Sequence, residues 1–433
     1  MSDAAPIGTP ARPYIGGQAV LEGVMMRAPT SFAIVVRRRD GSLHVRERAM
    51  TVGEERKGFA KLPLARGIAS LVESLRLGSE SLRFSAEQME RDMEAEEAEQ
   101  ARAKAKAGDA AAKATEKGKT TEKGKAAVKT AGSGALNALR AIGYTLFLLT
   151  TSEATSGAAP AASSSAEKAA EGDDPYRKNA LVVEPPRDEK KGSRAPMTMM
   201  LVLMVGFMIA LPQAAAAGVN RLLHLNLDVQ SPGFQALTGA FKLTIVIGYL
   251  LLVRNVFADI RRVFQYHGAE HKTITTYEHN EALTVENAKK HTTLHPRCGT
   301  TFLVMVAMVS ILVFTAVGGF LPKISTGNAA LDNVVFFLEK LPFLPLIAAV
   351  TFEIQRFFAR HCTTGPLRAL LWPGFLCQKI TTIEPDDDQL EVALASLRVT
   401  LFRESGEDVK SGGDVRYKDF DALMTSPQLR RAA

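Results

Sequence analysis

The stretch TFLVMVAMVSILVFTAVGGFL, residues 301–321, holds no charged side chain. About 20 consecutive apolar residues are enough for a helix to cross a bilayer, so this stretch predicts a transmembrane helix. Residues 199–217 are also free of charge and predict another. Two further apolar stretches, 234–257 and 334–352, contain charged residues, which a span shielded inside a bundle can carry. The sequence therefore predicts a bundle of about four transmembrane helices.

Basic residues flank these stretches on alternate loops. Arg254, Arg261 and Arg262 follow the second stretch, and Lys289 and Lys290 precede the third. Loops rich in lysine and arginine stay on the cytoplasmic side of a membrane. The pattern therefore predicts a multi-pass protein whose two termini and whose second connection between spans are all cytoplasmic.

Charge and cysteine content exclude other classes of protein. The formal net charge of +7 over 433 residues fits basic flanks at an anionic membrane surface, and we expect no nucleic-acid partner. Three scattered cysteines are too few for a disulfide framework. Residues 1–14 lack the apolar core of a signal peptide, so the internal stretches must direct insertion.

The remaining segments predict an α+β membrane protein with a small, cytoplasmic, β-rich module at its N-terminus. Residues 32–36 and 43–46 are β-prone and flank an Asp40-Gly41 pair, which favours a β-hairpin. Leucines at helical spacing within 64–84 then predict an amphipathic helix. We divide the chain into the hairpin module with its amphipathic helix (14–84), a low-complexity, largely disordered or loosely helical insert (87–195), the four-span bundle (197–383), a C-terminal helix (384–404) and a tail (405–433).

The pattern HGAEH, residues 267–271, marks the candidate site. Histidines four positions apart lie one turn apart on one face of a helix, where they can share a metal ion. Glu278 and several apolar residues fall on the same stripe, which we expect to continue the second span as one helix. We predict that His267 and His271 bind a divalent metal ion, zinc being the first candidate, and that Glu270 is the catalytic base.

Other residues are expected at the same cytoplasmic level and could complete the metal site. After the first two histidines we rank His295 or Glu278, then Glu353, with Cys298 as a softer ligand. The alternative is a polar helix end without metal, because histidines suit a membrane interface and nearby carboxylates and lysines can form ordinary ion pairs.

Four motifs closely resemble those of the YqhQ-like bacterial family: GGQAVLEGVMMR (16–27), YHGAEHKT (266–273), HPRCGT (295–300) and EPDDDQLEVA (384–393). This family carries a domain of unknown function and is described as predicted metal-dependent membrane enzymes. The resemblance implies a protein of the bacterial inner membrane but supplies no substrate. The long insert departs from the usual pattern of the family.

Two functions from different classes stay open. One is a metal-dependent hydrolase whose site lies at the cytoplasmic face of the membrane. The other is a non-catalytic, self-associating membrane scaffold or assembly protein, in which the polar residues hold the bundle together. Lys242, Glu339 and Lys340 near the spans suggest a transporter as a third. The expected partners are the lipid bilayer and further copies of the chain.

Overall fold

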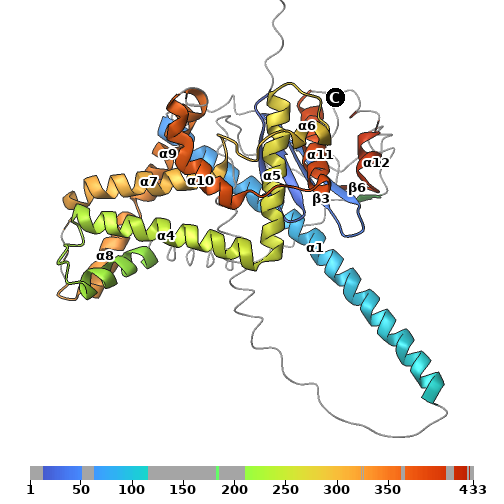
Figure 1. Cartoon of the computed structure of the whole chain (residues 1–433), viewed down its shortest axis with the longest axis horizontal. Coiled ribbons are helices and arrows are strands. Elements are labelled where there is room, and N and C mark those ends of the chain that lie inside the picture. Colours follow the sequence, from blue (N-terminus) through green and yellow to red (C-terminus); the bar gives the residue numbers. More distant parts are fainter. Residues whose placement is uncertain are drawn as a thin grey trace, which may run out of the picture.

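The computed structural model describes residues 13–50, 63–115, 182–184, 210–322, 324, 326–361, 366–405, 414–426 and 429. A small β-sheet with its covering helices lies at one end of the molecule, and a group of apolar helices lies at the other (Figure 1). The described chain is mostly helical, and its antiparallel sheet is built mainly from N-terminal strands. The predicted combination of an N-terminal β-module with helices is thereby confirmed.

Four N-terminal strands form an antiparallel meander, which two later strands extend. The sheet order is β1-β2-β3-β4-β6-β5. Asp40 and Gly41 turn the chain between β3 and β4, as predicted, and Gly41 adopts the positive φ of 83° that such a turn requires. The strands are β1 (Gly16–Val20), β2 (Gly23–Arg27), β3 (Ser31–Arg37), β4 (Leu43–Ala49), β5 (Val182–Glu184) and β6 (Asp414–Tyr417).

The C-terminal segment, expected as a tail, supplies both β6 and the short helix α12 (Phe420–Met424). Strand β6 pairs with β4 and buries Val415 and Tyr417 against the core. A strand of four residues is too short to give a recognisable alternating pattern. Its place in the sheet depends on the partner strand, β4, which lies more than 350 residues earlier in the chain.

Helices cover both faces of the sheet. Ala19 and Val35 on one face pack in the same core as Tyr266 of α5 and residues of α11. Phe32 on the other face packs in a second core with Phe84 of α1. A strand that is buried on both faces carries an unbroken run of apolar residues rather than an alternating one. This explains the five consecutive apolar residues 32–36 of β3. The helices of this end are α1 (Pro63–Thr115), α5 (Ala258–Glu278), α6 (Val285–Lys289) and α11 (Asp387–Glu404).

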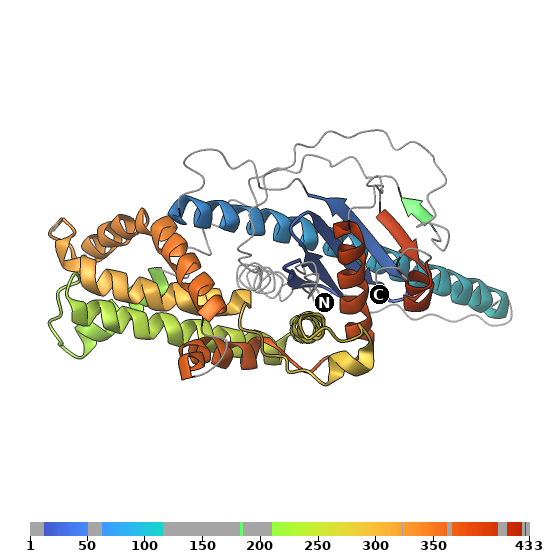
Figure 2. The ribbon, with the colours of Figure 1, turned by 90° about the horizontal axis from the view of Figure 1, so that it is seen from above.

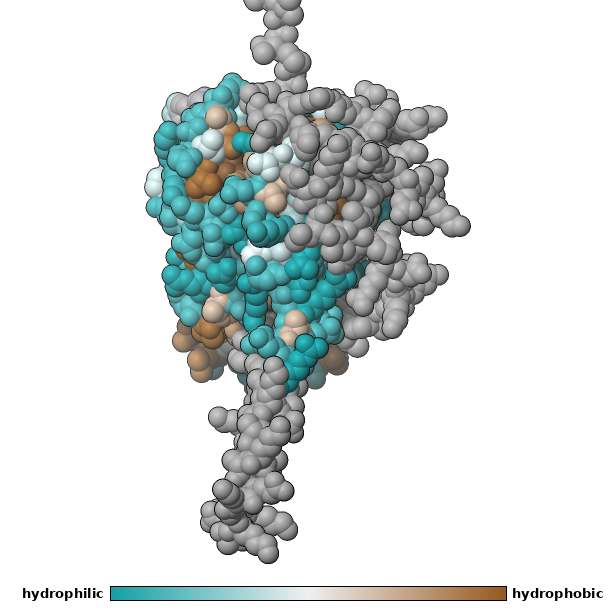
Figure 3. Space-filling view, turned by 90° about the vertical axis from the view of Figure 1, so that its right-hand side faces the viewer, coloured by the Kyte–Doolittle hydropathy of each residue, from teal (hydrophilic) through white to brown (hydrophobic). Residues whose placement is uncertain are grey.

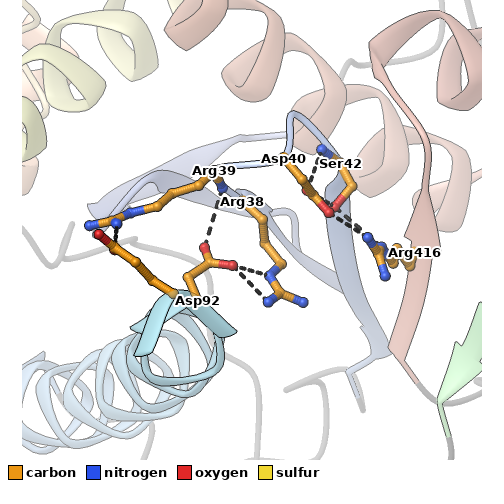
Figure 4. Close-up of polar contacts among 7 residues, drawn as sticks. Arg38, Arg39, Asp40, Ser42, Asp92 and Arg416 are labelled. Carbon is orange, nitrogen blue, oxygen red and sulfur yellow. Dashed lines mark hydrogen bonds and ion pairs between the residues drawn. The ribbon is translucent and has the colours of Figure 1, made fainter. Parts of the chain in front are cut away.

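Helix α1 continues well past the sheet (Figure 2). Residues 87–115, assigned from the sequence to the disordered or loosely helical insert, form the second half of this one helix. Two ion pairs attach it to the β3–β4 turn: Arg38 with Asp92 at 2.7 Å, and Arg39 with Glu96 (Figure 4). The segment is rich in good helix formers, but its ion-pair partners lie far away in the chain and no local pattern reveals them.

These two ion pairs are expected to differ in how much they stabilise the contact between α1 and the β3–β4 turn. The side chains of Arg38 and Asp92 are each 13% exposed, whereas those of Arg39 and Glu96 are 63% and 48% exposed. Removing one partner of a shielded pair leaves the other charge buried without a partner and costs about 1–3 kcal/mol of stability. An exposed pair contributes only about 0–1 kcal/mol of stability. We expect Arg38→Ala to speed cleavage of α1 by subtilisin roughly ten-fold, and Arg39→Ala to change it little. Equal cleavage rates in the two variants would contradict this assignment.

Two helices at the other end are long and apolar enough to cross a membrane: α4, and α7 together with the short η4. Helices α8 and α9 make a third span if they are taken together, with a bend of 45° between them. The described residues thus offer two or three spans, fewer than the four predicted. The predicted span 199–217 lies partly outside the described residues. The elements are α4 (Pro232–Val256), α7 (Gly299–Val317), η4 (Gly318–Phe320), α8 (Ala329–Lys340), α9 (Phe343–His361), η5 (Pro366–Leu371) and α10 (Trp372–Thr381).

A sharp corner separates α4 from α5, where the sequence predicted one continuous helix. Phe257 at the corner has an extended backbone, with φ −108° and ψ 109°, and its side chain is buried in the core below the sheet. Neither proline nor glycine stands there, so the local sequence gives no signal of a break. Because of this corner α5 runs across the direction of α4 and along the sheet (Figure 1).

The two ends of the molecule differ in surface polarity. The described surface at the sheet end is mostly hydrophilic (Figure 3). Large exposed apolar side chains gather instead on α4, α7, α8 and neighbouring elements, and Phe320 of η4 is 87% exposed. Contiguous apolar surface of this kind marks contact with a membrane or a partner. Examples are Leu252, Leu312, Phe320, Val334 and Leu338.

Candidate metal centre

Three side chains converge in the protein interior: His267 and His271 of α5, and Cys298, which caps the start of α7. One ligand atom of each lies within 4.8 Å of the other two. The two imidazole ring centroids are 4.4 Å apart, as expected for residues one helical turn apart. All three residues are buried. We call them the His–His–Cys cluster.

Backbone carbonyls fix the orientation of both imidazoles. Nδ1 of His267 lies 2.9 Å from the carbonyl oxygen of Thr381, and Nδ1 of His271 lies 2.5 Å from that of Thr293. A carbonyl can only accept, so each Nδ1 carries the proton and donates it, leaving a lone pair on Nε2. Histidines that bind metals are typically held in this way.

The residues of the cluster fit a metal ion. Nε2 of His267 lies 3.2 Å from Sγ of Cys298, and Nε2 of His271 has no hydrogen-bond partner among the described residues. A buried acceptor without a partner costs free energy, and a metal bound by the two Nε2 atoms and Sγ would satisfy all three. Two imidazoles with one thiolate are ligands typical of zinc, whereas magnesium and calcium take oxygen ligands.

Helix α10 holds the loop before α7 against α5. The side-chain amide of Gln378 accepts from the backbone N–H of His295 at 2.8 Å and donates to its carbonyl at 2.8 Å. The same amide nitrogen donates to Oγ1 of Thr301 at 2.8 Å. These bonds fix the turn that carries Cys298. Neither Gln378 nor the two carbonyls behind the histidines could be identified from the sequence, because backbone groups and glutamines carry no pattern of their own.

Gly268, the second residue of the HGAEH pattern, permits the close contact between α5 and the segment after α10. A Cβ at this position would collide with the backbone carbonyl of Ile383. The backbone N–H of Ile383 also donates to the carbonyl of Phe264, at 3.0 Å. Because Thr381 lies two residues earlier, this contact sets the position of the carbonyl that orients His267.

Burial keeps the two imidazoles neutral. Desolvation, opposed by the hydrogen bond to Thr381, lowers the pKa of His267 to about 4. Desolvation and repulsion from the neighbouring imidazoles lower the pKa of His271 well below its usual range. Sγ of Cys298 accepts from the backbone N–H of Thr300 at the start of α7. Neutral imidazoles are the form of histidine that binds metal.

The lowered pKa values predict how the metal-free protein responds to acid. Above about pH 6.5 both histidines are neutral whether the chain is folded or unfolded. Below that pH the unfolded chain takes up protons first, so stability falls as the pH drops toward about 4, by up to ~1.4 kcal/mol per pH unit for each histidine. We expect the melting temperature of chelator-treated protein to fall between pH 6.5 and pH 5, and His267→Gln to make this fall shallower. A melting temperature that is constant across this range would contradict the prediction.

The other predicted ligands do not join the cluster. The ring of His295 lies 5.6 Å from that of His271, and its Nε2 lies 3.4 Å from Oε2 of Glu278. Glu278 also forms an ion pair with Arg297 and so sits at the edge of the site. Glu353 lies on α9, partly buried, outside the three converging groups. Cys298, named from the sequence as a softer candidate, is the third member of the cluster because α7 begins beside the two histidines.

Glu270, the predicted base, is 1% exposed and lies next to His271 on α5. Its carboxylate lies against the backbone of β1, where a Cβ at Gly17 would come within 2.8 Å of Oε1. This contact explains why a glycine faces α5 at that point of the GGQAVLEG motif. The carboxylate is thus shielded from solvent, beside the cluster but on the flank of the helix that faces the sheet.

The chain has relatives of unknown function. A family described as "Protein of unknown function (DUF1385)" matches residues 62–402. The "Uncharacterized protein YqhQ" of Bacillus subtilis (strain 168) is 26% identical over 389 residues, which cover 90% of this chain and 92% of that protein. No solved structure matches the chain. Because the family match spans most of its length, this chain belongs to the DUF1385 family, as its resemblance to YqhQ-like sequences predicted.

Proposed function

We propose that the chain is a metal-dependent hydrolase of the bacterial inner membrane, with a zinc ion held by His267, His271 and Cys298. The observation that carries the proposal is the orientation of the cluster. Two backbone carbonyls accept the Nδ1 protons of both imidazoles, so each Nε2 keeps its lone pair, and the buried Nε2 of His271 has no hydrogen-bond partner among the described residues. A side chain packed only for stability has no reason to bury an acceptor without a partner.

Three protein ligands leave one coordination position open, which is the pattern of catalytic rather than structural zinc sites. A zinc ion there would supply Lewis acidity and lower the pKa of bound water. The chain itself supplies neutral imidazoles, a cysteine sulfur at a helix start and a dry environment. Glu270, shielded next to His271, is the group that we assign to proton transfer.

The apolar helices support placement in a membrane. Exposed leucines and other aliphatic side chains lie on α4, α7 and α8, whereas Arg254, Arg261 and Arg262 cluster at the corner where α4 meets α5. We assign these basic residues to the membrane surface and the cluster to the region just beyond it. We therefore infer that the sheet end and the cluster lie on the cytoplasmic side.

The experiment is hydrolysis of chromogenic carboxylic and phosphoric esters by the purified full-length protein, loaded with zinc in detergent. We expect turnover that chelation abolishes and zinc restores. His271→Ala should lack activity, and Glu270→Gln should keep zinc while losing about 100-fold or more in rate. A protein that purifies folded and free of any metal, and does not take up zinc, would overturn the proposal.

A second candidate function is favoured by the burial of the cluster. His271 and Cys298 are both 0% exposed, so a metal there could serve to lock α5, α7 and α10 together in a membrane scaffold. In that case zinc would be bound at one ion per chain, no ester would be hydrolysed, and Glu270→Gln would leave cellular function intact. The Glu270→Gln variant therefore separates the two candidates.

A further inference from the structure

Two lysines lie among the apolar helices, far from the His–His–Cys cluster. Nζ of Lys242 on α4 donates to Oγ of Ser310 on α7 at 3.0 Å. Nζ of Lys340, at the end of α8, donates to Oε1 of Gln213 at 3.0 Å and lies 4.5 Å from the ring centroid of Phe336. Lys340 is only 2% exposed. Neither lysine contributes to the metal site.

The two ammonium groups lie close to each other on one side of α7. Nζ of Lys340 is 5.3 Å from the ring centroid of Phe314, and Phe314 is one helical turn beyond Ser310. One turn of four residues advances about 6 Å along the helix axis. Lys242 and Lys340 are therefore neighbours, and Lys340 is near enough to be affected by the charge of Lys242.

No carboxylate lies within ion-pair distance of either lysine among the described residues. Each ammonium has three N–H donors, and the serine and glutamine oxygens each accept one hydrogen bond. The rings of Phe314 and Phe336 compensate the charge of Lys340 only partly. Two adjacent cations in an apolar setting are costly unless an anion joins them.

The position of this pair corresponds to the middle of a bilayer. Lys242, Ser310 and Lys340 each lie about ten residues, or about 15 Å, from the helix end farther from the cluster. That is half of the ~30 Å hydrocarbon thickness. The break between α8 and α9 directly follows Lys340. Interrupted helices at this depth occur where protein surrounds a binding site.

We propose that Lys242 and Lys340 form a binding site for a small oxyanion, a phosphate or carboxylate group. Two oxygens of such a group can each accept a charge-assisted hydrogen bond of about 2.8 Å, one from each ammonium. The depth of the site rests on the proposed membrane insertion, but the site itself does not depend on the metal. This oxyanion site is therefore separate from the proposed hydrolase centre.

The test uses the full-length protein in an uncharged maltoside detergent, with three probes: inorganic phosphate, acetate and phosphatidylglycerol. Binding is measured by equilibrium dialysis and by the shift in melting temperature. We expect at least one probe to bind near one per chain, and Lys242→Met or Lys340→Met to weaken it about ten-fold or more. Lys379→Met, which removes an exposed lysine from α10, is the matched control and should bind as the wild type does.

The outcomes distinguish a free anion from a lipid headgroup as the occupant of the site. They also distinguish failure of the oxyanion site from failure of the metal site. Binding of phosphate or acetate that requires both lysines identifies a free anion, whereas binding of phosphatidylglycerol alone identifies a lipid headgroup. Zinc content should be the same in all four proteins, so a failed metal proposal leaves this result standing. Without added anion, Lys340→Met should melt no lower than the wild type. No binding of any probe, or equal binding by Lys340→Met, overturns the proposal.

Discussion

Cys298→Ala is expected to purify without the metal ion that we expect the wild-type chain to carry. Sγ of Cys298 is the only sulfur among the three converging ligands, and two imidazoles alone hold zinc weakly. Losing just the hydrogen-bond partner behind a ligand costs roughly 10- to 100-fold in affinity, and losing the ligand itself should cost more. His271→Ala is expected to behave in the same way. The measurement is metal per chain by mass spectrometry after dialysis against buffer with a weak chelator.

Cys377→Ala supplies a matched control for this prediction. Cys377 is also buried, at 5% exposure, but it lies on α10 outside the cluster. Its variant should keep one metal per chain. The account fails if Cys298→Ala retains a full metal complement, or if the two cysteine variants lose metal equally.

Among glycine-to-alanine changes in the described chain, Gly268→Ala is expected to destabilise the fold most. The added Cβ would meet the carbonyl oxygen of Ile383, a backbone atom that cannot rotate away. Overpacking of this kind costs about 1–3 kcal/mol, or more where backbone must move. The shift would also displace the Thr381 carbonyl that orients His267. We expect a lower melting temperature in detergent together with loss of metal.

Gly248→Ala is the matched control for this substitution. Gly248 lies in α4, and a Cβ there would meet nothing within 4 Å. Alanine is a better helix former than glycine by about 1 kcal/mol, so this variant should melt at the same temperature or higher. A Gly268→Ala protein that melts like Gly248→Ala and keeps its metal would show that the contact between α5 and Ile383 is not essential.

Local patterns predicted much of this structure because they report on nearby residues. The Asp40-Gly41 turn was identified from two residues, and the shared face of His267 and His271 follows from their spacing on one helix. The charge-free stretch at 301–321 corresponds to α7 and η4, one of the two helices able to span a membrane. In each case the information lies within about 20 residues of sequence.

Contacts between distant segments account for what the sequence did not predict. The break at Phe257 is stabilised by packing in the core between the sheet and its helices, and β6 forms by pairing with β4 and β5. Cys298 was named only as a softer candidate, because its meeting with the two histidines depends on where α7 begins relative to α5. Glu278 fell on the correct stripe but lies too far along α5, where it pairs with His295 and Arg297 instead.

The central claim is that two imidazoles and one thiolate of this chain hold a single metal ion. X-ray absorption spectroscopy of the zinc-loaded, full-length protein tests it most directly. The account predicts one sulfur at about 2.3 Å and two imidazole nitrogens at about 2.0–2.1 Å, with the sulfur contribution absent in Cys298→Ala. A zinc spectrum without sulfur, or one with the same sulfur contribution in Cys298→Ala, would contradict it.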